Sequence, residues 1–277
     1  MKGKVLNGRL SYAAFMPGLS ILMPVFNERE TVRDAVTEAL ATSYPIDGVQ
    51  LVIVDDGSTD GSAEILAELA QDPRVTFVSH QRNAGKGAAV QTALQHATGT
   101  YAAIMDADLE YDPEDIGKLL EPIVAGEADV VYGTRGFESH SAFSFWYVIG
   151  NKGVTLAANL LFNSYLGDIM TCHKVMRTEI FKSLQLKSRG FDIEPEITGK
   201  LLASGHQIYE VPVRYNARGR DEGKKLTATD GLRVLRTLLE CRVSAGLRLP
   251  ERRRTQGPGA PGSEDGTGSS GELLRRV

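Results

Sequence analysis

Cysteine is scarce in this chain, which has two cysteines, Cys172 and Cys241, among its 277 residues. Two cysteines cannot build a disulfide framework, and these two do not have the paired spacing of a zinc site. So low a cysteine content fits a reducing compartment, where disulfides do not persist, and we expect a cytoplasmic protein.

Long apolar runs are also missing. No stretch reaches the roughly 18 apolar residues that indicate a membrane-spanning helix, so we expect no transmembrane segment. The first residues, Met1 to Val5, lack the apolar core of a secretory signal. Positive charge is not in excess either, because the formal net charge is −4. This argues against general nucleic-acid binding, which depends on cationic side chains.

Apolar and charged residues make up 42% and 24% of the chain, which is the composition of a soluble globular protein. In the first half, short apolar runs alternate with segments of helical periodicity. The runs cover residues 19–26, 49–55, 75–79 and 100–105, and the helical segments cover residues 31–41, 62–70 and 86–97. Runs without strict alternation predict strands that are buried on both faces. The pattern therefore predicts one α/β domain with a mostly parallel central sheet flanked by helices.

The second half is less regular. We expect strands at 129–133 and 208–215, a helix at 196–204 and an amphipathic basic helix at 228–247. Residues 250–277 are rich in Gly, Pro, Ser, Glu and Arg and poor in apolar residues, which predicts a disordered tail. The expected domain spans residues 18–240, and residues 241–249 form the end of the basic helix.

Three acidic residues follow the fourth apolar run: Asp106, Asp108 and Glu110. If the chain stays extended here, alternate side chains point to the same side, and the carboxylates repel one another unless a cation lies between them. A helix start explains part of the pattern differently, with Asp112 as the N-cap and Pro113 as the first helical residue. That alternative does not account for Asp106 and Asp108, so we expect a metal site.

Two other strand ends carry polar residues, and ligands of parallel sheets bind at the carboxyl ends of strands. Asp55 and Asp56 end the second run. They either begin a turn before a capped helix, or one of them accepts hydrogen bonds from a ribose or a base. Residues 83–87 (NAGKG) lack the spacing of a Walker loop. Gly85 and Lys86 could still lie close to a phosphate, or the segment could be a plain loop that caps a helix.

Together these segments resemble a known family. Four motifs occur in order at the expected strand ends: residues 23–28 (MPVFNE), 55–60 (DDGSTD), 83–87 (NAGKG) and 106–108 (DAD). They resemble the GT-A fold of family 2 glycosyltransferases over roughly residues 18–240. Four later motifs are similar to those of dolichyl- or polyprenyl-phosphate mannosyl- and glucosyltransferases: residues 133–135 (GTR), 168–174 (DIMTCHK), 190–196 (GFDIEPE) and 222–225 (EGKK).

The resemblance implies roles for individual residues. Asp106 and Asp108 would hold Mg²⁺ or Mn²⁺, and Glu110 stands where many relatives carry Gln, so its role as a third ligand is left open. Asp108 and Arg135 would act in catalysis, with Arg135 on phosphate unless it forms only a surface ion pair. The expected nucleotide-binding residues are Pro24, Phe26, Glu28, Asp56, Gly85 and Lys86, with Arg218, Arg220, Lys224 and Lys225 in a polar loop that either closes over the phosphates or stays solvated.

The subgroup also implies a nucleotide sugar of the GDP-mannose or UDP-glucose class as donor and a polyprenyl phosphate as acceptor. A lipid phosphate is already anionic near neutral pH, so it can attack the anomeric carbon with inversion and without a dedicated base. Glu194 and Glu196 are the candidates if a base exists, although an ion pair or a helix start is the simpler role for each. Three alternatives stay open. They are a same-fold enzyme for a saccharide or protein hydroxyl, a nucleotidyltransferase, whose glycine-rich N-terminal signature is missing from residues 21–30, and a non-catalytic protein that binds nucleotide sugars.

Two segments bear on membrane contact. The apolar segment 154–166 is too short to span a bilayer, so it either packs into the core or lies at the membrane surface beside the prenyl chain. Residues 233–254 contain seven arginines and two glutamates, and such segments are attracted to anionic headgroups. We therefore expect a peripheral protein at the inner face of the cell membrane, although an ordinary solvated helix would also explain the arginines.

Overall fold

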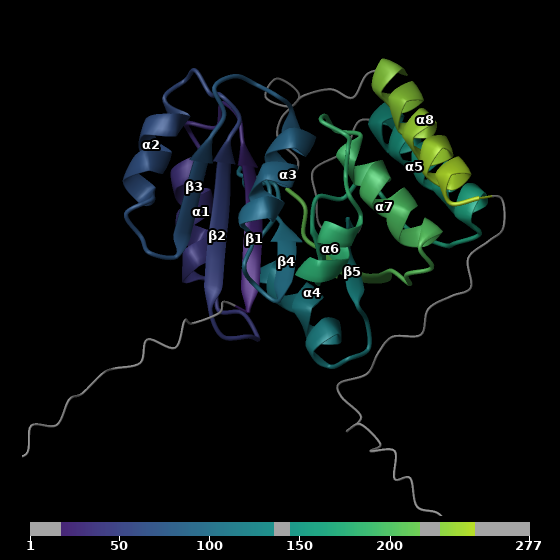
Figure 1. The fold of residues 1–277 in the computed structure, drawn as a ribbon, viewed down its shortest axis with the longest axis horizontal. Helices are drawn as coiled ribbons and strands as arrows, with labels where there is room; N and C mark the ends of the chain where they lie inside the picture. Colours follow the sequence, from purple (N-terminus) through teal and green to yellow (C-terminus); the bar gives the residue numbers. More distant parts are fainter. Residues whose placement is uncertain (1–17, 136–144, 217–227, 247–277) are drawn as a thin grey trace, which may run out of the picture.

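A seven-stranded sheet forms the centre of the structure, a computed structural model that describes residues 18–135, 145–216 and 228–246 (Figure 1). Its strands are β1 (Leu19–Val25), β2 (Val49–Asp55), β3 (Val75–Ser79), β4 (Tyr101–Ile104), β5 (Val130–Arg135), β6 (Lys174–Arg177) and β7 (Tyr209–Val213). They lie in the order β3-β2-β1-β4-β6-β5-β7. Four of the six neighbouring pairs are parallel, which confirms a mostly parallel sheet.

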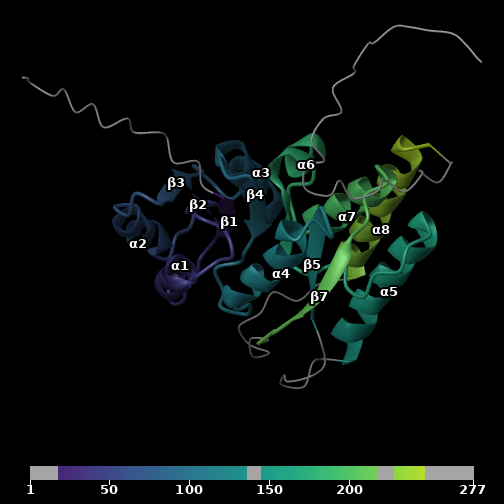
Figure 2. The ribbon, with the colours of Figure 1, turned by 90° about the horizontal axis from the view of Figure 1, so that it is seen from below.

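The predicted alternation of strands and helices is confirmed in the first half. Helices α1 (Val32–Ala41), α2 (Ser62–Leu69) and α3 (Lys86–His96) connect the first four strands. The central residues of β2, Leu51 to Val54, are fully buried, which explains why these four positions are all apolar. Helix α3 covers one face of the sheet, and α1 and α4 (Glu114–Val124) cover the other (Figure 2).

The patterns did not predict β6. This strand begins with Lys174 and ends with Arg177, so no apolar run indicates it in the sequence. It pairs antiparallel with both β4 and β5. Helices α6 (Thr178–Ser183) and α7 (Ile193–Ala203) follow it. Helix α4 starts one residue later than predicted, with Pro113 as its N-cap, although the Asp112 carboxylate does accept a hydrogen bond from the Glu114 amide at 2.9 Å.

A second, smaller core lies beside the sheet. Helices α5 (Phe145–Phe162) and α8 (Ala228–Ser244) pack side by side (Figures 1 and 2). Ala158 and Phe162 of α5 join Leu238 of α8 in this core. Leu160, by contrast, is 76% exposed, so the segment 154–166 is part core and part surface. Within the described residues, no helix is long and apolar enough to cross a membrane. The predicted tail lies outside them.

Candidate active site at the carboxyl edge of the sheet

The turn after β4 decides where the acidic residues lie. The strand ends at Ile104 and the chain then bends, with Leu109 in a left-handed conformation at φ +59°. The expectation of an extended chain through Glu110 is therefore wrong. The expected cluster of three carboxylates is not formed, because the described part of the chain holds no group of three His, Cys, Asp or Glu side chains that could bind a metal. Glu110 instead accepts a hydrogen bond from the Tyr215 hydroxyl at 2.7 Å.

Asp106 and Lys86 bring two of the predicted motifs together. Lys86 is the first residue of α3, and its Nζ lies 2.8 Å from Oδ2 of Asp106, just beyond the end of β4. Burial alone would raise the pKa of Asp106, but the neighbouring ammonium outweighs it and holds that pKa below its usual range. Burial alone would lower the pKa of Lys86, but nearby acidic groups, Asp106 foremost, keep it well above its usual value. Both side chains are therefore charged at neutral pH.

The two candidate bases are engaged in ion pairs, as the simpler interpretation predicted. The carboxylate of Glu194 lies 2.5 Å from Nζ of Lys174 and 3.3 Å from Nζ of Lys86. Glu196 pairs with Lys200 at 2.7 Å and accepts hydrogen bonds from the amides of residues 187 and 188. Burial raises the pKa of Glu196, but these partners together bring it below its usual value. Both carboxylates are therefore held by lysine side chains.

The acidic pair at the end of β2 holds loops in place. Asp56 is buried, lies 2.7 Å from Nδ1 of His80 and accepts hydrogen bonds from the amides of Ala84 and Gly85 at 2.9 and 2.7 Å. Asp55 is also buried, and it accepts a hydrogen bond from the Ser79 hydroxyl at 3.1 Å. The sequence predicts either a turn before a capped helix or an acid that accepts hydrogen bonds from a ribose or a base. In the structure, Asp56 fixes the loop that leads to Lys86.

The glycines of residues 83–87 lie against the protein's own backbone. Gly85 has φ +99°, a conformation that favours glycine, and a Cβ at this position would collide with the carbonyl oxygen of Arg189. A Cβ at Gly87 would collide with the carbonyl oxygen of Ser188. The amide of Ala88 donates to the Arg189 carbonyl at 3.1 Å. These two glycines therefore allow a close approach between the loop and the backbone of residues 188–190.

The loops after β1 and β2 are joined. Asn27 has φ +56°, and its side-chain oxygen accepts a hydrogen bond from the amide of Thr59 at 2.9 Å. Phe26, directly after the end of β1, is 40% exposed. Pro24 is half-buried within β1, and the half-buried Glu28 accepts a hydrogen bond from the Thr31 hydroxyl at 3.0 Å. These predicted nucleotide-binding residues therefore lie at one edge, with the Phe26 ring facing solvent.

Arg135 forms a buried ion pair with Asp168. Its Nε lies 2.5 Å from Oδ2 and its Nη2 donates to Oδ1 at 2.9 Å, so two residues from separate motifs bind each other. Burial alone would raise the pKa of Asp168, but Arg135 holds it below its usual value. The structure therefore contains an ion pair, as the alternative interpretation predicted, but this pair is buried and not at the surface. Arg218, Arg220, Lys224 and Lys225 lie outside the described residues.

An aromatic cluster that the sequence does not reveal lies next to these residues. The rings of Tyr111 and His173 have centroids 4.4 Å apart, and those of Tyr111 and Tyr215 are 5.0 Å apart. His173 is fully buried, neither ring nitrogen has a hydrogen-bond partner in the described structure, and burial lowers its pKa to about 4. Nothing in the sequence marked Tyr111 or Tyr215, which are brought together by contact between distant segments.

The carboxyl edge offers hard oxygen donors for a divalent cation. Asp106 and Asp108 are both only partly buried, and carboxylates are the side chains that Mg²⁺ and Mn²⁺ prefer. Two carboxylates suit a cation that completes its shell with water and substrate phosphates.

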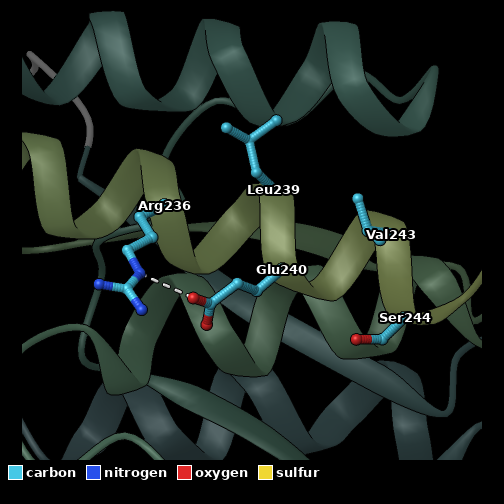
Figure 3. Close-up of a pocket in the computed structure, with 5 residues that line it drawn as sticks. All are labelled: Arg236, Leu239, Glu240, Val243 and Ser244. Carbon is cyan, nitrogen blue, oxygen red and sulfur yellow. Dashed lines mark hydrogen bonds and ion pairs between the residues drawn. The ribbon is translucent and has the colours of Figure 1, made fainter.

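A hollow on α8 is a separate feature. It is lined by five residues of that one helix: Arg236, Leu239, Glu240, Val243 and Ser244 (Figure 3).

Comparison with known proteins shows the family of this chain. The sequence model described as Glycosyl transferase family 2 matches residues 20–185. Glycosyltransferase AglJ of Haloferax volcanii is 31% identical over 72% of this chain and 63% of its own length. The dolichol-phosphate mannosyltransferase of Pyrococcus furiosus is 28% identical over 74% of this chain and 58% of its own. The chain therefore spans less than two thirds of the length of either relative.

A solved structure shares the fold. Glucosyl-3-phosphoglycerate synthase of Mycobacterium tuberculosis, determined with Mn²⁺, UDP-glucose and phosphoglyceric acid, is 20% identical. It superposes with a TM-score of 0.62 over 82% of this chain and 80% of its own. At this level of identity, the likeness shows the architecture and not the substrate.

Proposed function

Because the chain belongs to glycosyl transferase family 2, we propose that it transfers a hexose from a nucleotide sugar to a polyprenyl phosphate with inversion. The donor is of the GDP-mannose or UDP-glucose class. The observation that carries the proposal is the 2.8 Å contact between Lys86 and Asp106, because it joins two of the family's motifs at the edge where parallel sheets bind ligands. Relatives named as dolichol-phosphate and undecaprenyl-phosphate sugar transferases support the choice of acceptor.

On this proposal, Asp106 and Asp108 hold Mg²⁺ or Mn²⁺ together with the donor's diphosphate. When bound, such a cation supplies stabilisation of the negative charge that develops on the departing nucleotide. Phe26 offers a solvent-facing ring beside the joined loops, and a nucleobase can stack on a ring of this kind. Pro24 and Glu28 flank it. Asp56 acts indirectly, since it holds the loop that carries Lys86.

The ion pairs of Glu194 and Glu196 support a phosphate as the acceptor. A hydroxyl acceptor must lose its proton during attack and needs a base, whereas a phosphate oxyanion needs only positioning. Glu194 and Glu196 are both in ion pairs with lysines. Arg135 is held by Asp168. On this proposal, Arg135 shapes the acceptor side of the site and does not contact phosphate while this ion pair is intact.

A surface on α5 and α8 supports a place at the cytoplasmic membrane face. The exposed large apolar side chains of these helices include Leu156, Leu160, Leu232, Leu239 and Val243. Figure 3 shows Leu239 and Val243 extending from α8 away from the Arg236–Glu240 ion pair. A helix with apolar side chains on one side and charges on another can lie in the membrane interface, where a prenyl phosphate is accessible.

The test is a transfer assay with the full chain. Purified protein is incubated with radiolabelled GDP-mannose or UDP-glucose, polyprenyl phosphate and Mg²⁺ or Mn²⁺, and label is counted in the organic extract. We expect label in the lipid fraction with one donor, and none when the lipid is omitted. Transfer to a saccharide or protein acceptor, or donor binding without any turnover, would replace the proposal with one of its alternatives.

A further inference from the structure

Four side chains of alternating charge form a continuous ionic chain behind the candidate metal ligands. Asp106 lies 2.8 Å from Lys86, Lys86 lies 3.3 Å from Oε1 of Glu194, and Oε2 of Glu194 lies 2.5 Å from Lys174. Lys174 and Glu194 are almost completely buried, whereas the Asp106 side chain is 23% exposed. The ionic chain therefore runs from the site edge into the core.

The two contacts of Lys86 differ in kind. Its ammonium donates a hydrogen bond to Asp106. Oε1 of Glu194 is buried and accepts no hydrogen bond from the described residues, even though the same ammonium lies 3.3 Å away. A buried acceptor without a hydrogen bond is costly, so Glu194 gains if Lys86 turns toward it. Lys174 fixes the other oxygen of Glu194 and also donates to the carbonyls of Ile169 and Thr171, which anchors the carboxylate.

Resting on the proposed function, in which Asp106 meets a divalent cation, we propose that Lys86 is a positioning residue with two partners. It neutralises Asp106 before the cation is bound. It then releases Asp106 to the cation and turns to Oε1 of Glu194, to which it is already adjacent. Lys86 stays protonated throughout, and each carboxylate keeps a cation beside it. The site consequently has low affinity for a cation alone, because binding must first displace the ammonium.

The experiment measures Mn²⁺ binding by the full chain without any nucleotide, from the electron paramagnetic resonance signal of free Mn²⁺. Lys86→Met removes the competing ammonium, so its Mn²⁺ dissociation constant should fall about tenfold, the effect of removing one close ionic competitor. An affinity equal to or weaker than that of the parent would overturn the proposal. Lys187→Met, a change at an exposed lysine beside the segment that contacts Gly87, is the matched control and should leave the affinity unchanged.

Glu194→Gln tests the second partner. This near-isosteric change removes the carboxylate that receives Lys86, so the ammonium stays on Asp106 and Mn²⁺ should bind severalfold more weakly. If Glu194 acts through Lys86, the change should have no further effect in the Lys86→Met background, because coupled residues are not additive. Independent, additive effects would contradict the proposal. Lys86→Arg keeps a cation on Asp106 and serves if Lys86→Met does not fold. It should bind Mn²⁺ no more tightly than the parent, and tighter binding would contradict the proposal that the cationic side chain at position 86 competes with Mn²⁺ for Asp106.

A separate control distinguishes this inference from the proposed function. The same titration is repeated with UDP and with GDP, and with Asp108→Asn in place of the parent. If the parent binds no Mn²⁺ even with either nucleotide, the proposed metal site fails, and the role of Lys86 fails with it. If the parent binds Mn²⁺, Asp108→Asn does not, and Lys86→Met binds no more tightly than the parent, the proposed function stands and only the positioning role is lost.

Discussion

At the scale of single residues, Asp108 gives the most direct test of the proposed chemistry. Asp108→Asn removes one of two clustered acids, so the metal-free protein should melt at the same temperature or slightly higher. It should lose the stabilisation that Mn²⁺ with nucleotide gives the parent by mass action. Turnover should fall at least about 10²-fold, since a positioned metal contributes several kcal/mol. Thermal melting with and without Mn²⁺ and nucleotide checks the prediction on stability, and the transfer assay checks the prediction on turnover. Near-parental turnover with an unchanged metal response would refute the metal site.

Glu110→Gln is the companion variant, and we expect it to keep most of the activity. The Tyr215 hydroxyl donates to this carboxylate at 2.7 Å, and a Gln side-chain oxygen can accept the same hydrogen bond. Tyr215→Phe removes that donor and provides a control for the contact itself. Steady-state turnover of the two variants, compared at saturating Mn²⁺, is the measurement. A loss in Glu110→Gln as large as that in Asp108→Asn would mean that Glu110 is a metal ligand after all.

His173 should make stability depend on pH. Its folded-state pKa is about 4, against a usual value of 6.5, because burial disfavours the charged ring. Between these values the unfolded chain binds the extra proton, so stability rises with pH across the window and is lost as pH falls from 6.5 toward 4. The full difference corresponds to at most about 3 kcal/mol. Urea unfolding at pH 4.5 and 7 should show a smaller difference in His173→Gln than in the parent. The exposed His96→Gln is the control.

The residue-scale roles were only partly predictable from the sequence. The motifs placed Asp106 and Lys86 at strand and helix ends, and the structure brings them into contact. The roles of Asp56 and Arg135 depend on partners far along the chain, Gly85 and Asp168, which periodicity cannot identify. Spacing alone also suggested three converging acids, but a left-handed residue at Leu109 breaks the extended geometry on which that depended.

At the scale of elements, the exposed apolar side chains of α5 and α8 predict binding to anionic vesicles. Binding should weaken as salt rises, because the basic side chains are screened. Leu160→Asp on α5, combined with Leu239→Asp on α8, should abolish flotation with vesicles in low salt, since a charge in the interface opposes burial. Val124→Asp changes a residue that is also exposed but lies on α4, and it should float like the parent. Absence of flotation by the parent at every salt concentration would contradict the membrane proposal.

Element prediction succeeded where burial leaves a pattern. β1 and β2 are covered on both faces, so most of their residues are apolar, with Ser20 and Gln50 as the polar exceptions before the last residues, and the strands are visible in the sequence. β6 is different. Its first residue, Lys174, is fully buried because Glu194 on α7 neutralises its charge. The two residues are 20 positions apart, so the residues near Lys174 in the sequence do not show that its charge is paired. An antiparallel strand between two others therefore required the tertiary structure.

At the scale of the whole molecule, the two halves of the chain meet at the candidate site. The first half contributes the parallel strands and Lys86, and the second contributes α7 with Glu194. The backbone contact between Ala88 and Arg189 holds the same two halves together. A change on the side of Glu194 can thus alter cation binding at Asp106 without touching the first half.

Deleting residues 250–277 should separate catalysis from membrane attachment. All described residues of the two hydrophobic cores lie between Leu19 and Cys241, so the truncated chain should keep its melting temperature and turn over detergent-solubilised lipid phosphate within a few-fold of the parent. The deletion removes five arginines and four acidic residues, and three of the arginines, Arg252, Arg253 and Arg254, belong to the basic segment 233–254. Each basic residue near an anionic surface contributes roughly 1 kcal/mol, so flotation should fail at a lower salt concentration than for the parent. A longer deletion from residue 241 is the contrasting control, because it removes Cys241 from the second core and should lower the melting temperature. A truncated protein that folds but is inactive on solubilised lipid would show that the tail takes part in turnover.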